Sequence, residues 1–140
     1  MNAQHTIVHL DLGLEFRGGQ RQVLYLIAAQ RAQGHTVLLA CPCQAPLAEQ
    51  ARASNIPLLP LPSRYGLDPR NISLLVRAVQ PGSVLHTHEA RAASLGAATA
   101  WLYSRQGKCL HLVHTRRVSY ALGQGWSRWK YRQGHVVCVS

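Results

Sequence analysis

Apolar positions along the chain alternate between two spacings, and the alternation repeats roughly every 25 residues. Residues 7–12 form a short, continuous apolar run rich in branched side chains, which is typical of a buried strand. A loop at 13–19 with two adjacent glycines follows. It leads into a helix whose inward face is predicted to be Val23, Leu24, Ile27 and Ala28. Gly34 is expected to end this helix.

The same alternation continues through the rest of the sequence. Further strands are predicted at residues 36–41, 56–61, 84–88, 110–115 and 135–139, and further helices at about 46–54, 69–80, 91–104 and in the second half of 116–133. Pro57 and Pro60 interrupt the run at 56–61, which can therefore only be a short strand or an edge strand, because proline cannot donate a ladder hydrogen bond. Asp68 precedes Pro69 and is predicted to be a helix N-cap.

These elements predict a single α/β domain over residues 1–140. Near-continuous apolar strands indicate a sheet covered on both faces, which favours parallel strands with right-handed crossovers. We expect a Rossmann-like parallel sheet of about six strands, in the order 3-2-1-4-5-6, with helices on both faces. The binding crevice should lie between strands 1 and 4, with the glycine loop opposite residues 86–89.

Charge and composition narrow the class of partner. Fifteen Lys and Arg residues face five Asp and Glu residues, for a net charge of +10, which favours phosphate, nucleic acid or an acidic membrane surface as partner. No run of about 18 apolar residues predicts a membrane span, and the first residues lack a signal-peptide pattern, so a cytoplasmic location is expected. The four cysteines lack zinc-ligand spacing, and no metal site is expected.

Two of the five acidic residues and the glycine pair are candidate substrate or phosphate contacts. Glu15 and Glu89 come just after predicted strand ends, where open α/β sheets bind ligands. Gly18 and Gly19 begin a helix whose N–H groups could bind an anion, although a plain strand-to-helix turn explains them equally well. The chain lacks a GxGxxG pattern, a Walker lysine and an acid after the second strand, so no NAD cofactor is expected.

Histidines near the end of the fourth strand carry the candidate chemistry. His88 is predicted to act in catalysis, by accepting a proton or by hydrogen-bonding a substrate hydroxyl, and a structural role is the alternative. His86 shares its face but lies deeper, and is predicted to be a core histidine bonded to backbone. His9 is likewise predicted to be structural.

Basic and aromatic residues gather towards the C-terminus. Arg116 and Arg117 follow the fifth strand and are candidates for phosphate binding, with a solvated loop as the alternative. Candidates to face a membrane are Trp126, Arg128, Trp129, Lys130 and Arg132. Stacking on nucleic-acid bases and packing of the tryptophans onto the domain are alternative explanations of this segment.

Taken in order, these motifs resemble the N-terminal, acceptor-side domain of a GT-B glycosyltransferase, most similar to glycosyltransferase family 4. Members open with a strand, a loop ending in Gly-Gly, and a helix followed by Gly-His and another strand. Here these are residues 7–12, Gly18-Gly19, 23–32, Gly34-His35 and 36–40. His86-Thr87-His88-Glu89 matches the family's His-x-His-Glu motif, and residues 136–140 resemble the strand before the family's second domain.

The resemblance implies a retaining enzyme that moves a sugar from a nucleotide-sugar donor to a lipid or glycan acceptor of the bacterial envelope, such as lipopolysaccharide. Gly19 would correspond to the glycine near the donor diphosphate, and His88 to the rim histidine that contacts the acceptor or the transferred sugar. Many relatives are peripheral enzymes on the inner face of the cell membrane. The family's donor-binding domain is expected to be missing from these 140 residues, so the chain alone should be inactive.

Two other classes of function remain open. A stand-alone basic Rossmann-like module would bind nucleic acid or anionic membrane through its arginines, independently of Gly19 and His88. A GT-B sugar-nucleotide epimerase would share the same fold. Under the transferase interpretation no cofactor is expected apart from the donor substrate, and nucleic acid is not an expected partner.

Overall fold

The computed structural model describes residues 4–116 and 125–138, and these contain six strands and five helices. The strands are β1 (Thr6–Leu10), β2 (Thr36–Pro42), β3 (Leu58–Leu61), β4 (Val84–Thr87), β5 (His111–Arg116) and β6 (His135–Cys138). The helices are α1 (Gly18–Ala32), α2 (Pro46–Ala53), α3 (Pro69–Ala78), α4 (Ala90–Arg105) and α5 (Trp126–Arg132). The predicted sequence of elements is confirmed.

All six strands belong to one parallel sheet in the order β3-β2-β1-β4-β5-β6, as predicted. The strand that carries Pro60 lies at one edge, where its missing N–H disrupts no ladder. The order reverses between β1 and β4, because β2 and β3 extend the sheet on one side and β4 to β6 on the other. The carboxyl ends of β1 and β4 are therefore the expected place for a ligand.

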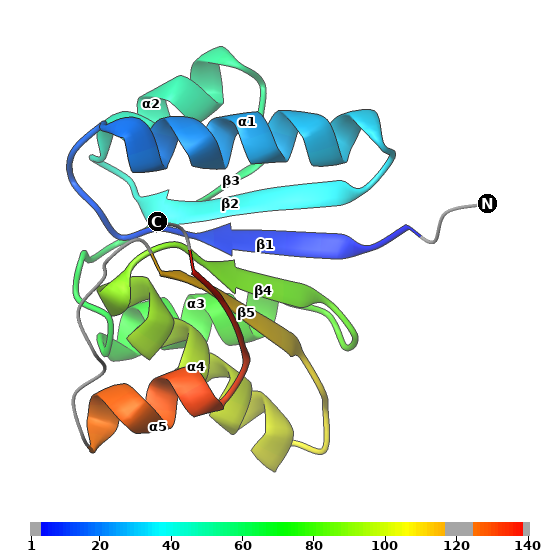
Figure 1. Cartoon of the computed structure of the whole chain (residues 1–140), viewed down its shortest axis with the longest axis vertical. Coiled ribbons are helices and arrows are strands. Elements are labelled where there is room, and N and C mark those ends of the chain that lie inside the picture. Colours follow the sequence, from blue (N-terminus) through cyan, green and yellow to red (C-terminus); the bar gives the residue numbers. More distant parts are fainter. Residues whose placement is uncertain (1–3, 117–124, 139–140) are drawn as a thin grey trace.

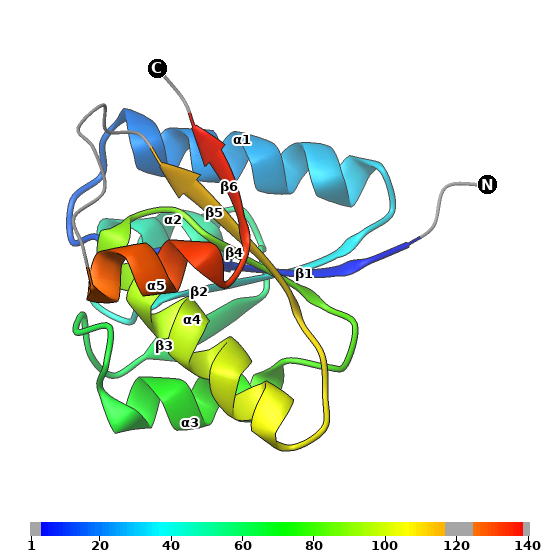
Figure 2. The same cartoon turned by 60° about the horizontal axis from the view of Figure 1, so that its bottom comes forward.

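Helices cover both faces of the sheet. Figure 1 shows α1 and α2 on one side and α3, α4 and α5 on the other, and Figure 2 shows α5 beside α4. Each face has its own core. The core under α1 and α2 contains Val23, Ile27, Val37, Leu39 and Leu47. The core on the opposite face contains Val8, Leu10, Leu75, Leu85, Leu95 and Tyr103.

Helix α4 approaches the sheet most closely at Gly96. A Cβ built there would lie 2.6 Å from Cγ2 of Thr87 in β4 and 3.2 Å from Cδ1 of Leu112 in β5. The glycine therefore allows a helix rich in small residues to lie directly on the strands that carry the candidate site. The helix also contacts α3 and α5.

Small shifts of the element bounds change the setting of the candidate site. Strand β4 ends at Thr87, one residue before the predicted bound, so His88 lies in the connection and Glu89 is the N-cap of α4. Asp68 caps α3 as predicted, with its carboxylate accepting from the N–H of Arg70 at 2.9 Å. None of the helices among the described residues has the length and apolar character needed to cross a membrane.

Candidate functional site

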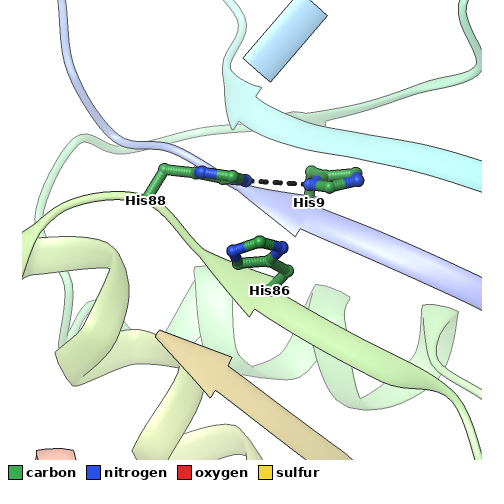
Figure 3. A group of neighbouring side chains, drawn as sticks. All are labelled: His9, His86 and His88. Atoms are coloured by element: carbon green, nitrogen blue, oxygen red, sulfur yellow. Dashed lines mark hydrogen bonds between the residues drawn. The ribbon is translucent and has the colours of Figure 1, made fainter. Parts of the chain in front are cut away.

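Three histidine rings from β1 and the end of β4 gather at the carboxyl edge of the sheet (Figure 3). His9 and His86 are register partners on the two neighbouring strands, and His88 follows two residues after His86. Nδ1 of His9 lies 2.8 Å from Nε2 of His88. The rings of His86 and His88 stack with their centroids 4.2 Å apart. His86 and His88 were predicted to share a face of the sheet, and the register of β1 and β4 brings His9 to the same place.

A hydrogen-bond chain determines which nitrogen of each ring carries a proton. Oε1 of Gln30 in α1 lies 2.7 Å from Nε2 of His9. An amide oxygen only accepts, so Nε2 of His9 carries the proton and Nδ1 has a lone pair. That lone pair accepts from Nε2–H of His88, so the neutral His88 ring is protonated at Nε2. Burial lowers the pKa of His9 to about 4, against the weaker raising effect of the Gln30 bond.

His86 is bonded differently from the prediction. Its Nε2 lies 2.6 Å from Oγ1 of Thr115 on β5, so its partner there is a side-chain hydroxyl. The ring is half-buried, whereas His9 and His88 are almost completely buried. The proposed structural role of His9 is compatible with its contacts, but these contacts also connect it directly to His88.

Glu89 connects the two loops that border the crevice. Its carboxylate accepts from the N–H groups of Ala92 at 2.7 Å and Arg91 at 2.9 Å, as the N-cap of α4. The same carboxylate accepts from the N–H of Leu12, just after β1, at 3.1 Å. Both oxygens of the carboxylate that was predicted to contact substrate therefore hold the backbone around the crevice.

A cleft of about 400 Å³ lies beside this clamp, at the carboxyl ends of β1 and β4. Glu15 and Glu89, both predicted contacts, line it. Three arginines that the sequence analysis did not single out also line it: Arg17, Arg64 and Arg91. Arg17 and Arg64 come from two different connections and Arg91 from the first turn of α4, so only the folded chain places their charge together. The positions of Arg17 and Arg91, each within two residues of a predicted contact, were the available signal.

Acidic residues balance part of this charge. Nε of Arg17 lies 2.7 Å from Oε2 of Glu15, between two exposed side chains. Nε of Arg91 lies 3.9 Å from Oε2 of Glu89. Arg64 lies over the ring of Tyr65 at 5.4 Å. Arg17 is also the N-cap of α1, immediately before Gly18 and Gly19, so the cleft borders the start of that helix.

Gly18 and Gly19 are the first residues of α1, and no acidic residue lies in that first turn. A Cβ built at Gly18 would meet nothing within 4 Å, so the backbone there is open to a ligand. The N-terminus of a helix carries partial positive charge and N–H donors that suit a phosphate group. The glycine pair and His88 lie at the same edge of the sheet, after neighbouring strands.

The two arginines predicted at the end of β5 have different outcomes. Arg116 is half-buried, and its guanidinium lies over the ring of Tyr131 at 5.5 Å. It does not belong to the lining of the cleft described above. Arg117 lies outside the described residues.

Both tryptophans of helix α5, predicted to face a membrane, contact the domain. The rings of Trp126 and Trp129 stack at 4.8 Å, and Trp129 packs against the core. Nε1 of Trp126 donates to Oγ of Ser94 in α4. Arg128 and Arg132 are exposed.

The prediction of Lys130 as a membrane-facing cation is wrong. Its side chain is buried, and its Nζ donates to the carbonyl of Ala90 at 3.1 Å and to Oγ of Ser94 at 3.2 Å. Burial lowers the pKa of this ammonium group. The alternation of charges in the sequence does not reveal that this lysine points inward, against the start of α4.

A larger groove of about 710 Å³ lies between α3 and α4. Val76, Leu102 and Tyr103 contribute to its apolar lining. None of the predicted site residues lines it, so its size does not make it the candidate active site.

Comparison with known proteins identifies a family and a related fold. The model of the family described as Glycosyltransferase Family 4 matches residues 16–140, which confirms the resemblance drawn from the motifs. A glycosyltransferase from Rickettsia africae ESF-5 matches the structure with a TM-score of 0.72 at 16% sequence identity. The match covers 99% of this chain and 38% of that one, so the chain spans well under half of its length. No curated protein sequence matches the chain.

Proposed function

Because the chain belongs to glycosyltransferase family 4, we propose that it is the acceptor-side domain of a retaining glycosyltransferase. The full enzyme moves a sugar from a nucleotide-sugar donor to a lipid or glycan acceptor of the bacterial envelope. A second, donor-binding domain faces the carboxyl edge of the sheet and completes the active site. The share of the Rickettsia africae enzyme that this chain spans is compatible with one domain of two.

The observation that carries the proposal is the arginine-lined cleft at the start of α1. Arg17, Arg64 and Arg91 bring cationic side chains to this cleft, and Arg17 immediately precedes Gly18, the first residue of α1. Guanidinium groups and helix N–H donors are suited to phosphate oxygens, which both a nucleotide-sugar and a phosphorylated acceptor carry. In this proposal the backbone at Gly18 and Gly19 contacts the donor diphosphate.

His88 contacts the acceptor or the transferred sugar in the proposed reaction. Its place immediately before Glu89, which lines the cleft, supports a role beside the proposed substrate site. Its hydrogen bond with His9 fixes the orientation of the ring before substrate arrives. With its proton on Nε2, the neutral His88 ring can accept a hydrogen bond from a sugar hydroxyl at Nδ1.

Transfer from labelled nucleotide-sugars, assayed with the complete polypeptide, tests the proposal. We expect incorporation of sugar into a lipid or glycan fraction, and a loss of roughly 100-fold in kcat for His88→Ala, as for removal of a positioned acid–base group. His111→Ala, at an exposed position on β5, is the matched control and should keep full activity. Interconversion of free nucleotide-sugars without transfer would instead indicate the epimerase alternative.

We further propose that the enzyme is peripheral on the inner face of the cell membrane, through the exposed part of α5. Trp126 keeps 44% of its surface exposed beside the exposed Arg128 and Arg132. Sedimentation with anionic and with neutral vesicles tests this. Trp126→Ala combined with Arg128→Ala should reduce binding to anionic vesicles. Binding that is unchanged in this variant, or salt-sensitive binding to nucleic acid alone, would contradict it.

A further inference from the structure

Three imidazole rings converge on one face of the sheet because of strand register alone. His9 in β1 is the register partner of His86 in β4, so their side chains leave the sheet side by side. His88 comes two residues after His86 and projects to the same side (Figure 3). One nitrogen from each ring lies within 4.8 Å of those from the other two. This is a compact set of three nitrogen ligands.

The spacing of these nitrogens is close to what a metal ion needs. Nδ1 of His9 and Nε2 of His88 are 2.8 Å apart. Around a tetrahedral ion with metal–nitrogen bonds of about 2.0–2.1 Å, two ligand nitrogens lie roughly 3.3 Å apart. The pair must therefore separate by only a few tenths of an ångström, and the third nitrogen must move inward.

Groups behind two of the rings hold them as ligands. Metal-bound histidines typically donate their second N–H to a neighbouring acceptor, which orients the ring. Oε1 of Gln30 accepts from Nε2 of His9, so Nδ1 faces the cluster as an acceptor. Oγ1 of Thr115 lies 2.6 Å from Nε2 of His86, so a hydroxyl on β5 holds the His86 ring from its Nε2 edge.

We propose that His9, His86 and His88 bind one divalent first-row transition ion of the zinc type. A donor set of imidazoles alone suits zinc, cobalt, nickel or copper, whereas magnesium and calcium prefer oxygen ligands. Three protein ligands leave a fourth position for water or an anionic oxygen. Within the described residues no other group of three histidine, cysteine or acidic side chains has this arrangement.

Binding changes the tautomer of His88 but not its charge. In the metal-free hydrogen-bond chain Nε2 of His88 carries the proton donated to His9. When Nε2 binds the ion, that proton leaves and Nδ1 takes one up, so the ring stays neutral. The chain therefore has two alternative states, a hydrogen-bonded pair and a metal-bound triad. Nδ1 of His88 can accept a hydrogen bond from a sugar hydroxyl only in the hydrogen-bonded state, because it carries a proton in the metal-bound state.

Titration of the chelator-treated 140-residue chain with Co²⁺, followed by displacement with Zn²⁺, tests the site. We expect one Co²⁺ per chain with the strong visible absorption of tetrahedral nitrogen coordination. We also expect a change in the ¹⁵N shifts of His88 as its tautomer changes. His86→Ala should weaken binding at least 100-fold, and Gln30→Leu about 10- to 100-fold through loss of the group that orients His9.

Matched controls separate the triad from other ligands on the chain. His35→Ala removes the stacked pair of His5 and His35, and Cys43→Ser removes a half-buried thiol; both should bind Co²⁺ normally. His86 is only half-buried, so His86→Ala and a second variant, His86→Asn, keep the test independent of folding defects at His9, with circular dichroism as the check.

No stoichiometric binding, or binding that survives in both folded His86 variants, would overturn the proposal. So would binding that is lost in Cys43→Ser instead. In each of these cases the three rings are a hydrogen-bonded cluster without a metal.

Discussion

Nε2 of His88 lies 2.8 Å from Nδ1 of His9, so a side-chain hydrogen bond joins residues 79 positions apart in the chain. Gln30 holds the outer nitrogen of His9 at 2.7 Å. Together the three side chains form a line from α1 through β1 to the end of β4. Because an amide oxygen cannot donate, the proton positions along this line are fixed from the Gln30 end.

Replacement of Gln30 by Glu should reverse the direction of the hydrogen bond between His9 and His88. A carboxylate beside His9 favours its charged form, and a doubly protonated His9 must donate to Nε2 of His88. His88 then carries its proton on Nδ1. The ¹⁵N shifts of the His88 ring in the metal-free chain report the change. Gln22→Glu, an exposed position on the same helix, is the control. An unchanged His88 tautomer in Gln30→Glu would contradict the predicted reversal.

Stability should fall on moderate acidification. Burial lowers the pKa of both His9 and His114 to about 4, from an ordinary value of 6.5. Between these values the unfolded chain binds protons that the folded chain does not, so the free energy of unfolding decreases as pH falls from about 6.5 to 4. The loss is up to roughly 3 kcal/mol for each histidine.

Urea denaturation at pH 7.5, 6, 5 and 4.5 measures this slope. His114→Gln should flatten it, since one of the two buried rings is then absent. The exposed His111→Ala should not change it. Equal stability of the wild-type chain at pH 7.5 and 4.5 would contradict the prediction. Asp68, whose pKa is lowered to about 2 by its bonds to Arg70, contributes only below this window.

Glu89→Ala should destabilise the domain by about 1–2 kcal/mol, because it removes the N-cap of α4. The variant also removes the acceptor of the Leu12 N–H, whose nitrogen lies 3.1 Å from Oε1 of Glu89. Thermal unfolding measures the effect. Glu49→Ala, on the exposed side of α2, is the control and should change stability by less than about 0.5 kcal/mol. A Glu89→Ala variant as stable as this control would show that the clamp does not hold the two loops.

Two glycine-to-alanine variants should have opposite consequences. Gly96→Ala puts a methyl group 2.6 Å from Thr87 and should cost about 1–3 kcal/mol, despite the better helix propensity of alanine. Gly18→Ala meets nothing within 4 Å and should leave stability nearly unchanged. If the diphosphate binds at the start of α1, Gly18→Ala should nevertheless weaken binding of nucleotide-sugar to the complete enzyme. Unimpaired binding would argue against a ligand at this turn.

Arg64→Ala should weaken binding of phosphate-containing ligands in the cleft. One lost guanidinium contact at an exposed site corresponds to about a fivefold to tenfold loss, or about 1–1.4 kcal/mol. Calorimetry with inorganic pyrophosphate on the 140-residue chain, at low and moderate salt, provides the measurement. Arg77→Ala, on α3, removes the same charge outside this cleft. Equal losses in the two variants would mean that net charge alone attracts the anion.

Much of the fold followed from local pattern. Apolar runs such as that around Val8 and Leu10 predicted buried strands, the two prolines of residues 56–61 predicted a short or edge strand, and Asp68 before Pro69 predicted a helix start. The order of strands followed because parallel α/β units obey handedness rules that leave few arrangements. The end of β4 did not follow from local pattern. Glu89 caps α4 immediately after His88, and strand propensity does not indicate this cap.

The candidate site was only partly accessible from the sequence. Residues next to strand ends, such as Glu15, were found because the carboxyl edge of a parallel sheet is a general place for ligands. Arg64 was missed because it lies on a loop far from β1 and β4 in the sequence. Lys130 was misplaced because a short helix of alternating aromatic and basic residues does not show which side packs inward.

Local spacing therefore determined which segments are strands and helices, since burial of an apolar face depends on residues two, three or four positions apart. The tertiary structure alone decided that His9, His86 and His88 meet, and that Gln30 fixes the proton on their outermost ring. Contacts of this kind depend on the register of neighbouring strands and the position of a helix above them. A shift of one residue in that register would turn the same side chains to the opposite face of the sheet.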